Sequence, residues 1–306
     1  MDFDKNSSVL ITGGCGFIGR AVVKLLLRAG YRVVSLDVSP PGAARDHESA
    51  RHVMCDISDG DQLQRVFEAE AIGVIVHLAA ILPTAAQRDP LRATQVNVDG
   101  SIHLLEMAGR FGVGRMVFGS SLSIYGTWPA DHVVCETDRA VPKDLYGAAK
   151  LYVERLGEAY RDCHGLEFVS LRIGRVIGPG AQSATSAWRS QIFELLGARD
   201  PAEIALPYVG SERVLLVHVD DVARMLAALL QAAHPAHAVY NAPCESVVVA
   251  DLKREVEGLN SNITIKLGEG LAVGNPRLLD SNRFQKEFGF RMASMADWLT
   301  KAAETH

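Results

Sequence analysis

The stretch TGGCGFIG at residues 12–19 decides the fold of this chain. It follows the short β-branched run Ser8–Thr12 and opens the helical pattern Ile18–Ala29. Glycines at a strand-to-helix turn let backbone amides approach a phosphate at the positive end of the helix, where a side chain would block access. Readings as GxGxxG from Gly14 and as GxxGxxG from Gly13 both fit, and either alone is weak support. The turn predicts a phosphate site that the rest of the chain must justify.

Outward from this turn, short β-branched runs alternate with longer segments of helical spacing. The predicted strands are Ser8–Thr12, Arg32–Asp37, His52–Asp56, Val74–His77, Arg115–Ser120 and Phe168–Arg172. The predicted helices are Ile18–Ala29, Asp61–Glu68, Leu91–Phe111 and Leu145–Asp162. Such alternation is typical of a parallel sheet covered by helices. We therefore predict an α/β fold with a doubly wound parallel sheet of the Rossmann type.

The alternation of strands and helices becomes less regular in the last third of the chain, although one further strand-helix unit is predicted at Leu215–Gln231. We interpret residues 1–172 as a Rossmann domain that carries the phosphate site, to which residues 215–240 return. Residues 173–214 and 241–306 are predicted to form a smaller C-terminal domain that binds substrate.

Composition excludes several classes of function. The 306 residues include 31 basic and 36 acidic side chains, a net charge of −5, and the basic residues are scattered, which argues against a nucleic-acid partner. Charged or polar residues interrupt every long apolar run, so no membrane span is expected. The N-terminus is acidic and lacks the pattern of a signal peptide, so we expect a cytoplasmic protein.

Cysteine and histidine spacing gives no sign of a metal. The 5 cysteines are widely separated without a Cys-x-x-Cys pair, which favours reduced thiols. His77 and His218 lie in apolar, strand-like surroundings with no second ligand at metal spacing. We predict no metal site and interpret both histidines as structural.

Asp37 ends the second predicted strand, about twenty residues beyond the glycine turn. A carboxylate there can accept hydrogen bonds from both ribose hydroxyls of an adenosine, and it would repel a 2′-phosphate. No Arg or Lys directly follows Asp37. The pattern favours NAD over NADP as the cofactor, although Asp37 could also simply end a strand in a turn.

Tyr146 and Lys150, in YGAAK, lie one turn apart on a predicted helix that Asp144 could cap. A phenol titrates near pH 10 and is a poor base at neutrality. A positive charge about 4 Å away, at an effective dielectric of about 20, could lower the phenol pKa by about three units. Taken alone, Tyr-x-x-x-Lys more often marks a solvated helix face.

Hydroxyl groups occur where the fifth predicted strand ends, in GSSLSIYG at residues 119–126. The carboxyl ends of parallel strands line the ligand crevice of such sheets. Ser121 or a neighbouring serine could therefore hydrogen-bond a substrate alcohol or carbonyl while Tyr146 moves its proton.

Together these motifs resemble the extended short-chain dehydrogenase/reductase superfamily, in particular its NAD-dependent epimerase/dehydratase family. The resemblance covers nearly the whole chain and is far more specific than any single motif. It rests on TGGCGFIG, Asp37, CDISD with Asp56, VIVHLAA (74–80), NVDGSIHLLEMA (97–108), GSSLSIYG, YGAAKLYVE, LRIGRVIGPG (171–180), VHVDDVA (217–223) and LLDSNRFQKEFGF (278–290).

The resemblance implies roles for individual residues. Ser121, Tyr146 and Lys150 would form the catalytic set. Together with Tyr146 and Lys150, the residues that would hold NAD are Gly13, Gly16, Phe17, Ile18, Asp37, Asp56, Ile57, Leu78, Ala79, Ala80 and Asn97. Asp56 would lie near the adenine, and Ser123 matches a position that often faces substrate. Family members commonly dimerise through two helices, here at about 92–111 and 145–163, so a homodimer is implied.

Departures from the family pattern concern the substrate. Leu122 and Ser123 replace the Asp-Glu pair of the dehydratases, so dehydration is not expected. Nucleotide-sugar epimerases usually carry Asn where this chain has Arg175, and they place Arg where this chain has Val214. A guanidinium suits a carboxylate, so Arg175 could instead bind a small acid, as could Arg189 or Arg213. The predicted substrate-binding residues are Ser121, Ser123, Tyr146 and Arg175.

Three functions remain open on the sequence. The first is an NAD-dependent epimerase of a nucleotide sugar or related sugar, with Tyr146 as acid and base. The second is a dehydrogenase or reductase of a small sugar acid, polyol or other secondary alcohol. The third, a non-catalytic NAD-binding protein, is disfavoured because such proteins usually lose the Tyr or the Lys, and both are present.

Overall fold

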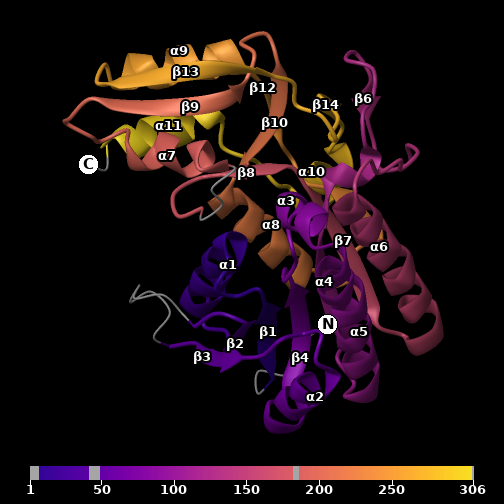
Figure 1. The fold of residues 1–306 in the computed structure, drawn as a ribbon. Helices are drawn as coiled ribbons and strands as arrows, with labels where there is room; N and C mark the ends of the chain where they lie inside the picture. Colours follow the sequence, from indigo (N-terminus) through magenta and orange to yellow (C-terminus); the bar gives the residue numbers. More distant parts are fainter. Residues whose placement is uncertain (1–6, 41–48, 182–185, 305–306) are drawn as a thin grey trace.

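The computed structural model describes residues 7–40, 49–181 and 186–304, and its largest sheet carries the glycine turn. This sheet has seven parallel strands in the order β11-β7-β5-β4-β1-β2-β3 (Figure 1). They are β1 (Ser8–Thr12), β2 (Val33–Asp37), β3 (Arg51–Met54), β4 (Ile72–His77), β5 (Arg115–Ser121), β7 (Glu167–Ile173) and β11 (Val239–Asn241). The predicted doubly wound sheet is confirmed, and β11 is an edge strand that was not predicted.

Helices cover both faces of this sheet (Figure 1). The α-helices in the described part of the whole chain are α1 (Phe17–Arg28), α2 (Gly60–Ala69), α3 (Pro83–Arg88), α4 (Pro90–Thr94), α5 (Gly100–Arg110), α6 (Leu145–His164), α7 (Trp188–Glu194), α8 (Val219–Gln231), α9 (Val249–Leu259), α10 (Asn282–Phe288) and α11 (Met295–Glu304). The single helix predicted over Leu91–Phe111 is interrupted, because a π-helical turn at Gln95–Asp99 separates α4 from α5.

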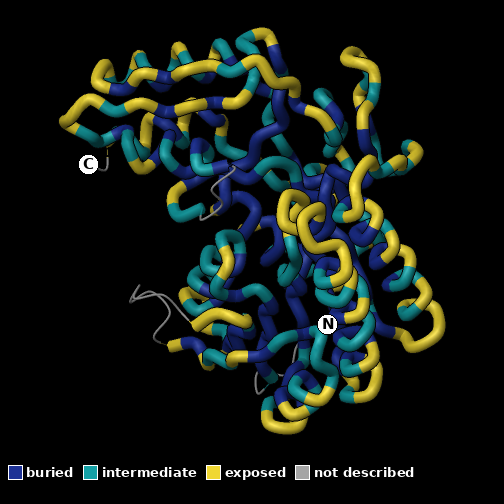
Figure 2. The backbone as a smooth tube through the Cα atoms, in the orientation of Figure 1, coloured by how far each residue is buried: buried dark blue, intermediate teal, exposed yellow. Residues whose placement is uncertain are grey.

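The core follows the two-residue period of the strands, whose alternate side chains point to opposite faces. Val9 and Ile11 of β1 pack with α1 and α8, whereas Leu10 packs with α2, α5 and α6. Both faces are therefore buried, which explains why the central strands read as nearly continuous apolar runs. Figure 2 shows these strands as the buried centre of the molecule.

Smaller sheets lie beyond the carboxyl ends of the large one (Figure 1). A three-stranded sheet contains β8 (Arg175–Ile177), β10 (Arg213–His218) and β12 (Glu245–Val248), and a parallel pair contains β9 (Ala202–Tyr208) and β13 (Ile263–Gly270). A short pair joins β6 (Val133–Val134) to β14 (Leu278–Leu279). Helices α7, α9 and α11 share a separate apolar core with these sheets, and its members include Trp188, Ile204 and Leu299.

Residues 215–240 divide between the two groups of sheets. The helix α8 packs on the large sheet and β11 joins its edge, but β10 pairs with β8 and β12 instead. The predicted return of this segment thus applies to its helix and its last strand. The exact division into two domains stays a prediction.

None of the helices in the described ranges combines the length and apolar character needed to cross a bilayer. Within the same residues, no group of three or more His, Cys, Asp or Glu side chains is arranged to hold a metal ion.

Candidate active site

The glycine turn is packed so closely that side chains would not fit in it. Gly13 has a φ of +70°, and a Cβ on it would lie 2.8 Å from the amide nitrogen of Ala79. A Cβ on Gly19, in the first turn of α1, would lie 2.0 Å from the carbonyl oxygen of Gly13. Gly16 is the N-cap of α1, so its neighbours Phe17 and Ile18 begin the helix. The turn thus presents bare backbone at a helix N-terminus, which is the setting that a pyrophosphate requires.

Asp37 reaches this turn from the end of β2. Its Oδ2 accepts a hydrogen bond from the Cys15 amide at 3.0 Å, and its Oδ1 accepts one from the Ser39 amide at 3.0 Å. The carboxylate therefore lies against the glycine turn, as expected for a group that would contact an adenosine ribose.

Asp56 lies in an ionic contact that was not predicted. Its carboxylate accepts hydrogen bonds from the Ser58 amide at 3.0 Å and the Ser58 hydroxyl at 2.7 Å, and it pairs with the Arg92 guanidinium of α4. Burial raises the pKa of Asp56, but the hydrogen bonds from Ser58 and Arg92 outweigh it, so the pKa lies below its usual value. Ile57 is buried beneath Gly100, where a Cβ would come within 2.6 Å of its Cγ1.

The loop after β4, which contains Leu78, Ala79 and Ala80, is held from two sides. The amides of Leu78 and Ala79 each donate to Thr12 Oγ1 at 3.2 Å. Asn97, in the π-helical turn, accepts from the Ile81 amide at 2.7 Å and donates to the Ile81 carbonyl at 2.9 Å. Both ends of the Asn97 side-chain amide thus contact Ile81, the residue that directly follows Ala80.

His77 is a buried structural residue, as predicted from its surroundings. Its Nδ1 lies 2.7 Å from Thr12 Oγ1, and its Nε2 lies 3.0 Å from Ser101 Oγ. Burial holds the pKa of His77 well below its ordinary value, and the charge of Lys150 acts in the same direction. A neutral imidazole therefore bridges β1 and α5 behind the glycine turn.

Strand β5 and helix α6 are joined at successive residues. Gly119 accepts a hydrogen bond from Lys150 Nζ at 2.7 Å, and Ser120 Oγ donates to Glu154 Oε1 at 2.5 Å. The Ser121 side chain hydrogen-bonds Tyr146. Tyr146, Lys150 and Glu154 recur every fourth residue on one face of α6, so this face docks in register on the end of β5.

The register begins at Asp144, which caps α6 by accepting from the Gly147 amide at 2.7 Å. The structure therefore brings Ser121, Tyr146 and Lys150 together, at the strand end where the sequence placed them. Ser123 belongs to the same group, because its Oγ lies 2.5 Å from Ser121 Oγ.

The pKa of Tyr146 departs from expectation. Burial raises it to about 12, with a smaller rise from Asp144 and an opposing effect of the Ser121 hydrogen bond. The ammonium of Lys150 lies 5.6 Å from the Tyr146 ring centre and 4.5 Å from the Phe118 ring centre. Burial also lowers the pKa of Lys150 to about 7, against the charge of Glu154. The prediction that Lys150 lowers the pKa of Tyr146 is wrong for the protein alone, because the cation is drawn to Gly119 and partly loses its proton at neutrality.

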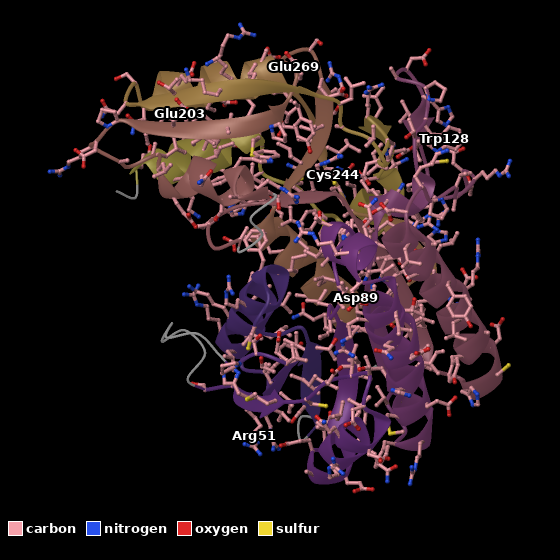
Figure 3. The ribbon with its side chains drawn as sticks, in the orientation of Figure 1. Arg51, Asp89, Trp128, Glu203, Cys244 and Glu269 are labelled. Carbon is pink, nitrogen blue, oxygen red and sulfur yellow. The ribbon has the colours of Figure 1, made fainter. Side chains whose placement is uncertain are left out.

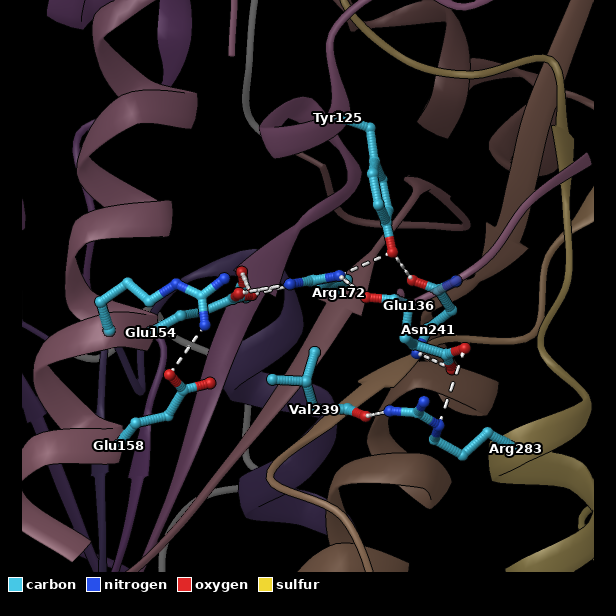
Figure 4. A network of polar contacts seen from close by, with 10 residues as sticks. Tyr125, Glu136, Glu154, Glu158, Arg172, Val239, Asn241 and Arg283 are labelled. Atoms are coloured by element: carbon cyan, nitrogen blue, oxygen red, sulfur yellow. Dashed lines mark hydrogen bonds and ion pairs between the residues drawn. The ribbon is translucent and has the colours of Figure 1, made fainter. Parts of the chain in front are cut away.

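A buried ionic network supports this region and was not predicted (Figure 4). Arg172 of β7 donates to both carboxylate oxygens of Glu154, the shortest contact being 2.7 Å, and to the hydroxyl of Tyr125 at 2.7 Å. The Tyr125 hydroxyl donates in turn to Asn241 Oδ1 at 2.8 Å. Glu154 and Arg172 stand within the quoted motifs YGAAKLYVE and LRIGRVIGPG, but no spacing rule pairs them.

Arg175 lies close beyond the catalytic end of β5. It begins β8, two residues after Ile173, and Ile173 pairs in register with Ser121. Gly174 lies between Ile173 and Arg175 in the chain. A Cβ on Gly174 would lie 2.7 Å from Cys244 Sγ and 3.3 Å from Leu122 Cδ1, so the backbone is tightly packed where it passes between the two groups of sheets. Figure 3 labels Cys244 at this junction. The Arg175 guanidinium donates to the Val273 carbonyl at 3.3 Å.

Comparisons with known proteins agree with this geometry. A family model described as "NAD dependent epimerase/dehydratase family" matches residues 9–242. The chain is 39% identical over 174 residues to a UDP-glucose 4-epimerase of Lacticaseibacillus casei, covering 56% of this chain and 52% of that protein. It is 29% identical over 187 residues to a uronate dehydrogenase of Pseudomonas syringae pv. tomato, covering 60% and 64%. The chain thus spans about half the length of the first curated relatives it matches.

Solved structures match over nearly the whole chain. A Thermus thermophilus UDP-glucose 4-epimerase in complex with NAD has a TM-score of 0.82 at 25% identity, covering 97% of this chain and 98% of that one. An L-threonine dehydrogenase from Cupriavidus necator has a TM-score of 0.87 at 21% identity, covering 98% and 100%, which is a likeness of fold alone.

Proposed function

The chain belongs to the NAD-dependent epimerase/dehydratase family of extended short-chain dehydrogenases/reductases, and from this premise we propose that it is an NAD-dependent epimerase of a nucleotide sugar or related sugar. The observation that carries the proposal is the docking of α6 on β5. It gathers the polar groups of Ser121, Tyr146 and Lys150 at the strand ends, beside the glycine turn.

NAD is the cofactor of this family, and the residues present fit it. The turn at Gly13 and Gly19 leaves room only for backbone, and Asp37 adds a carboxylate for a ribose. When bound, NAD would accept a hydride from an alcohol carbon and could return it. We propose that the residues holding it are Gly13, Gly16, Phe17, Ile18, Asp37, Asp56, Ile57, Leu78, Ala79, Ala80, Asn97, Tyr146 and Lys150.

Residues of the chain itself would transfer the proton of the substrate hydroxyl. Ser121 Oγ is placed to hydrogen-bond the substrate oxygen, and Tyr146 Oη would take the hydroxyl proton and give it back. Because burial holds the pKa of Tyr146 at about 12, proton transfer needs the positive charge of Lys150. Glu154 favours that charge, since it raises the pKa of Lys150 against the effect of burial.

Arg175 favours a second candidate, an NAD-dependent dehydrogenase of a small sugar acid. Its guanidinium stands where nucleotide-sugar epimerases usually have Asn, and a carboxylate would suit it. The uronate dehydrogenase among the relatives is consistent with this alternative.

A panel of UDP-sugars, sugar acids and polyols, incubated with the full chain and NAD, separates the two candidates. Product analysis should detect an epimer of a UDP-sugar without net absorbance at 340 nm, whereas stoichiometric NADH from a sugar acid would replace the first candidate by the second. Tyr146→Phe should lower turnover by about 100-fold or more. Tyr152→Phe, at a half-exposed tyrosine of the same helix, is the matched control and should leave turnover unchanged. Undiminished turnover in Tyr146→Phe would contradict the catalytic assignment.

We also propose a homodimer, as the family resemblance implies. Helices α5 and α6 lie side by side on one outer face of the large sheet (Figure 1).

A further inference from the structure

Two arginines of the smaller group of elements lie next to each other, and neither has a partner of opposite charge among the residues that the structure describes. Arg175 begins β8 and Arg189 belongs to α7. The two elements are fastened together, because the Gly178 amide, directly after β8, donates to the Arg189 carbonyl at 3.0 Å. Both side chains face Tyr208 of β9. The Arg175 Cζ lies 5.9 Å from the Tyr208 ring centre, and the phenol interacts electrostatically with Arg189.

The Arg189 side chain is incompletely satisfied. Its Nε is buried and has no hydrogen-bond partner among the described residues. In the described part of the chain neither Arg175 nor Arg189 forms an ion pair, whereas the buried Arg172 is paired with Glu154. Burial lowers the pKa of Arg189, and the charge of Arg175 lowers it further. Holding two cations together in partial burial is costly, so the site favours a bound anion.

The arginine pair is connected to the strand end that holds Ser121 and to a surface hollow. Toward the catalytic side, Arg175 follows Ile173, the register partner of Ser121. Toward the other side, Trp188 meets the Tyr208 ring edge-on at 6.1 Å and lines a hollow of about 390 Å³. The remaining lining residues are Ala187, Gln191, Ala205, Leu206, Pro207, Lys266, Leu267 and Gly268. Arg175 thus lies two residues along the chain from the register partner of Ser121, and Tyr208 and Trp188 connect the arginine pair to the hollow.

We propose that Arg175 and Arg189 together form a binding site for an oxyanion carried by the substrate. A guanidinium donates two parallel hydrogen bonds, which match the paired oxygens of a carboxylate or a phosphate. The inference rests on the proposed function and specifies the substrate class of that site. The oxyanion has two chemical sources, the carboxylate of a sugar acid and the diphosphate of a nucleotide sugar.

Titration calorimetry of the full chain saturated with NAD tests the site without requiring turnover. The probes are D-glucuronate, UDP and UDP-glucose, with D-glucose as the uncharged reference. The variants are Arg175→Gln and Arg189→Gln, and Arg254→Gln is the matched control because that arginine is exposed on α9. Thermal unfolding confirms that each variant is folded. A charge-assisted hydrogen bond is worth about 1.5–3 kcal/mol, so each site variant should weaken the bound anion about 10-fold to 100-fold.

The arms of the experiment separate the two sources. Weakened binding of D-glucuronate with UDP unchanged identifies the carboxylate, and weakened binding of UDP and UDP-glucose identifies the diphosphate. The inference is overturned if no anionic probe binds the wild type, or if both site variants bind every anion as tightly as Arg254→Gln does. Anion binding that depends on the two arginines, in a protein that turns over no sugar of the panel, would support this site and reject the proposed function.

Discussion

Burial drives the pKa values of Tyr146 and Lys150 in opposite directions, and in both cases it favours the uncharged side chain. The pKa of Tyr146 rises to about 12, and that of Lys150 falls to about 7. Both groups lie among apolar and backbone atoms that cannot solvate a charge as water does. At neutral pH the phenol of Tyr146 is therefore uncharged, and the amine of Lys150 is only partly protonated.

Lys150 should make the stability of the protein depend on pH just above neutrality. Its folded pKa of about 7 lies below its ordinary value of 10.5, so between these values the unfolded chain binds more protons. Raising the pH therefore stabilises the folded state, and this contribution is lost as the pH falls through about 7. The expected slope is up to about 1.4 kcal/mol per pH unit. Denaturant unfolding between about pH 7 and 8 measures it, below the ordinary pKa values of about 8.5 for cysteine and about 10 for tyrosine.

Two variants separate Lys150 from its surroundings. Lys150→Met should remove this part of the slope, because it keeps a long apolar side chain and loses the titrating amine. Tyr146→Phe should retain it, since the raised pKa of Tyr146 affects stability only above about pH 10. Equal slopes in the wild type and Lys150→Met would show that the amine is not buried as described.

At the scale of an element, the turn into α1 depends on glycine through steric fit rather than through flexibility. Gly19→Ala would place a methyl group 2.0 Å from the Gly13 carbonyl oxygen, so the turn must open. We expect a loss of about 2 kcal/mol or more in the free energy of unfolding and at least 10-fold weaker NAD binding. Chemical denaturation and titration with NAD measure the two effects.

Gly109→Ala is the matched substitution in a helix. Gly109 lies near the end of α5, is exposed, and has no atom within 4 Å of the position a Cβ would take. Alanine has the higher helix propensity, so this variant should be up to about 1 kcal/mol more stable and should bind NAD normally. If Gly19→Ala behaved like Gly109→Ala, the close packing of the turn would be refuted.

The large elements could be predicted because their signals are local. Strand β1, the turn and α1 follow from one run of β-branched residues, glycines and helical spacing. The π-helical turn at Gln95–Asp99 could not be predicted, because its residues continue the helical pattern of the sequence. The contact of Asn97 with Ile81, which accompanies this turn, is visible only in the folded chain. The pairing of β10 with β8 is likewise decided by contacts distant in sequence.

The same distinction holds for the candidate site. The glycines and Asp37 were placed by their spacing along the first two strands, and the structure puts Asp37 in contact with Cys15 of the glycine turn. The ion pairs of Asp56 with Arg92 and of Glu154 with Arg172 were missed, since 36 and 18 residues separate the partners and no periodicity links them. The proximity of Arg175 to Arg189 depends on how β8 meets α7, which only the folded chain reveals.

At the scale of the whole molecule, one buried network connects α6 to β11 and to the segment before α10 (Figure 4). It runs from Glu154 on α6 through Arg172 and Tyr125 to Asn241 on β11. Asn241 donates to the carbonyl of Asp280, which precedes α10. Five residues that are distant in sequence thus share one set of hydrogen bonds, so a substitution at its centre should destabilise all the elements that the network connects.

Tyr125→Phe tests this coupling at the centre of the network. The variant keeps the ring but leaves Arg172 without one acceptor and Asn241 Oδ1 without its donor, both in a buried setting. Unsatisfied buried groups cost about 1–3 kcal/mol, and more where a charge is involved, so we expect a loss of that size in the free energy of unfolding. Tyr152→Phe removes the hydroxyl of a tyrosine that is 50% exposed and should change stability by less than about 0.5 kcal/mol. Equal stability of the two variants in urea would mean that the hydroxyl of Tyr125 does not hold the catalytic helix to β11 and the segment before α10.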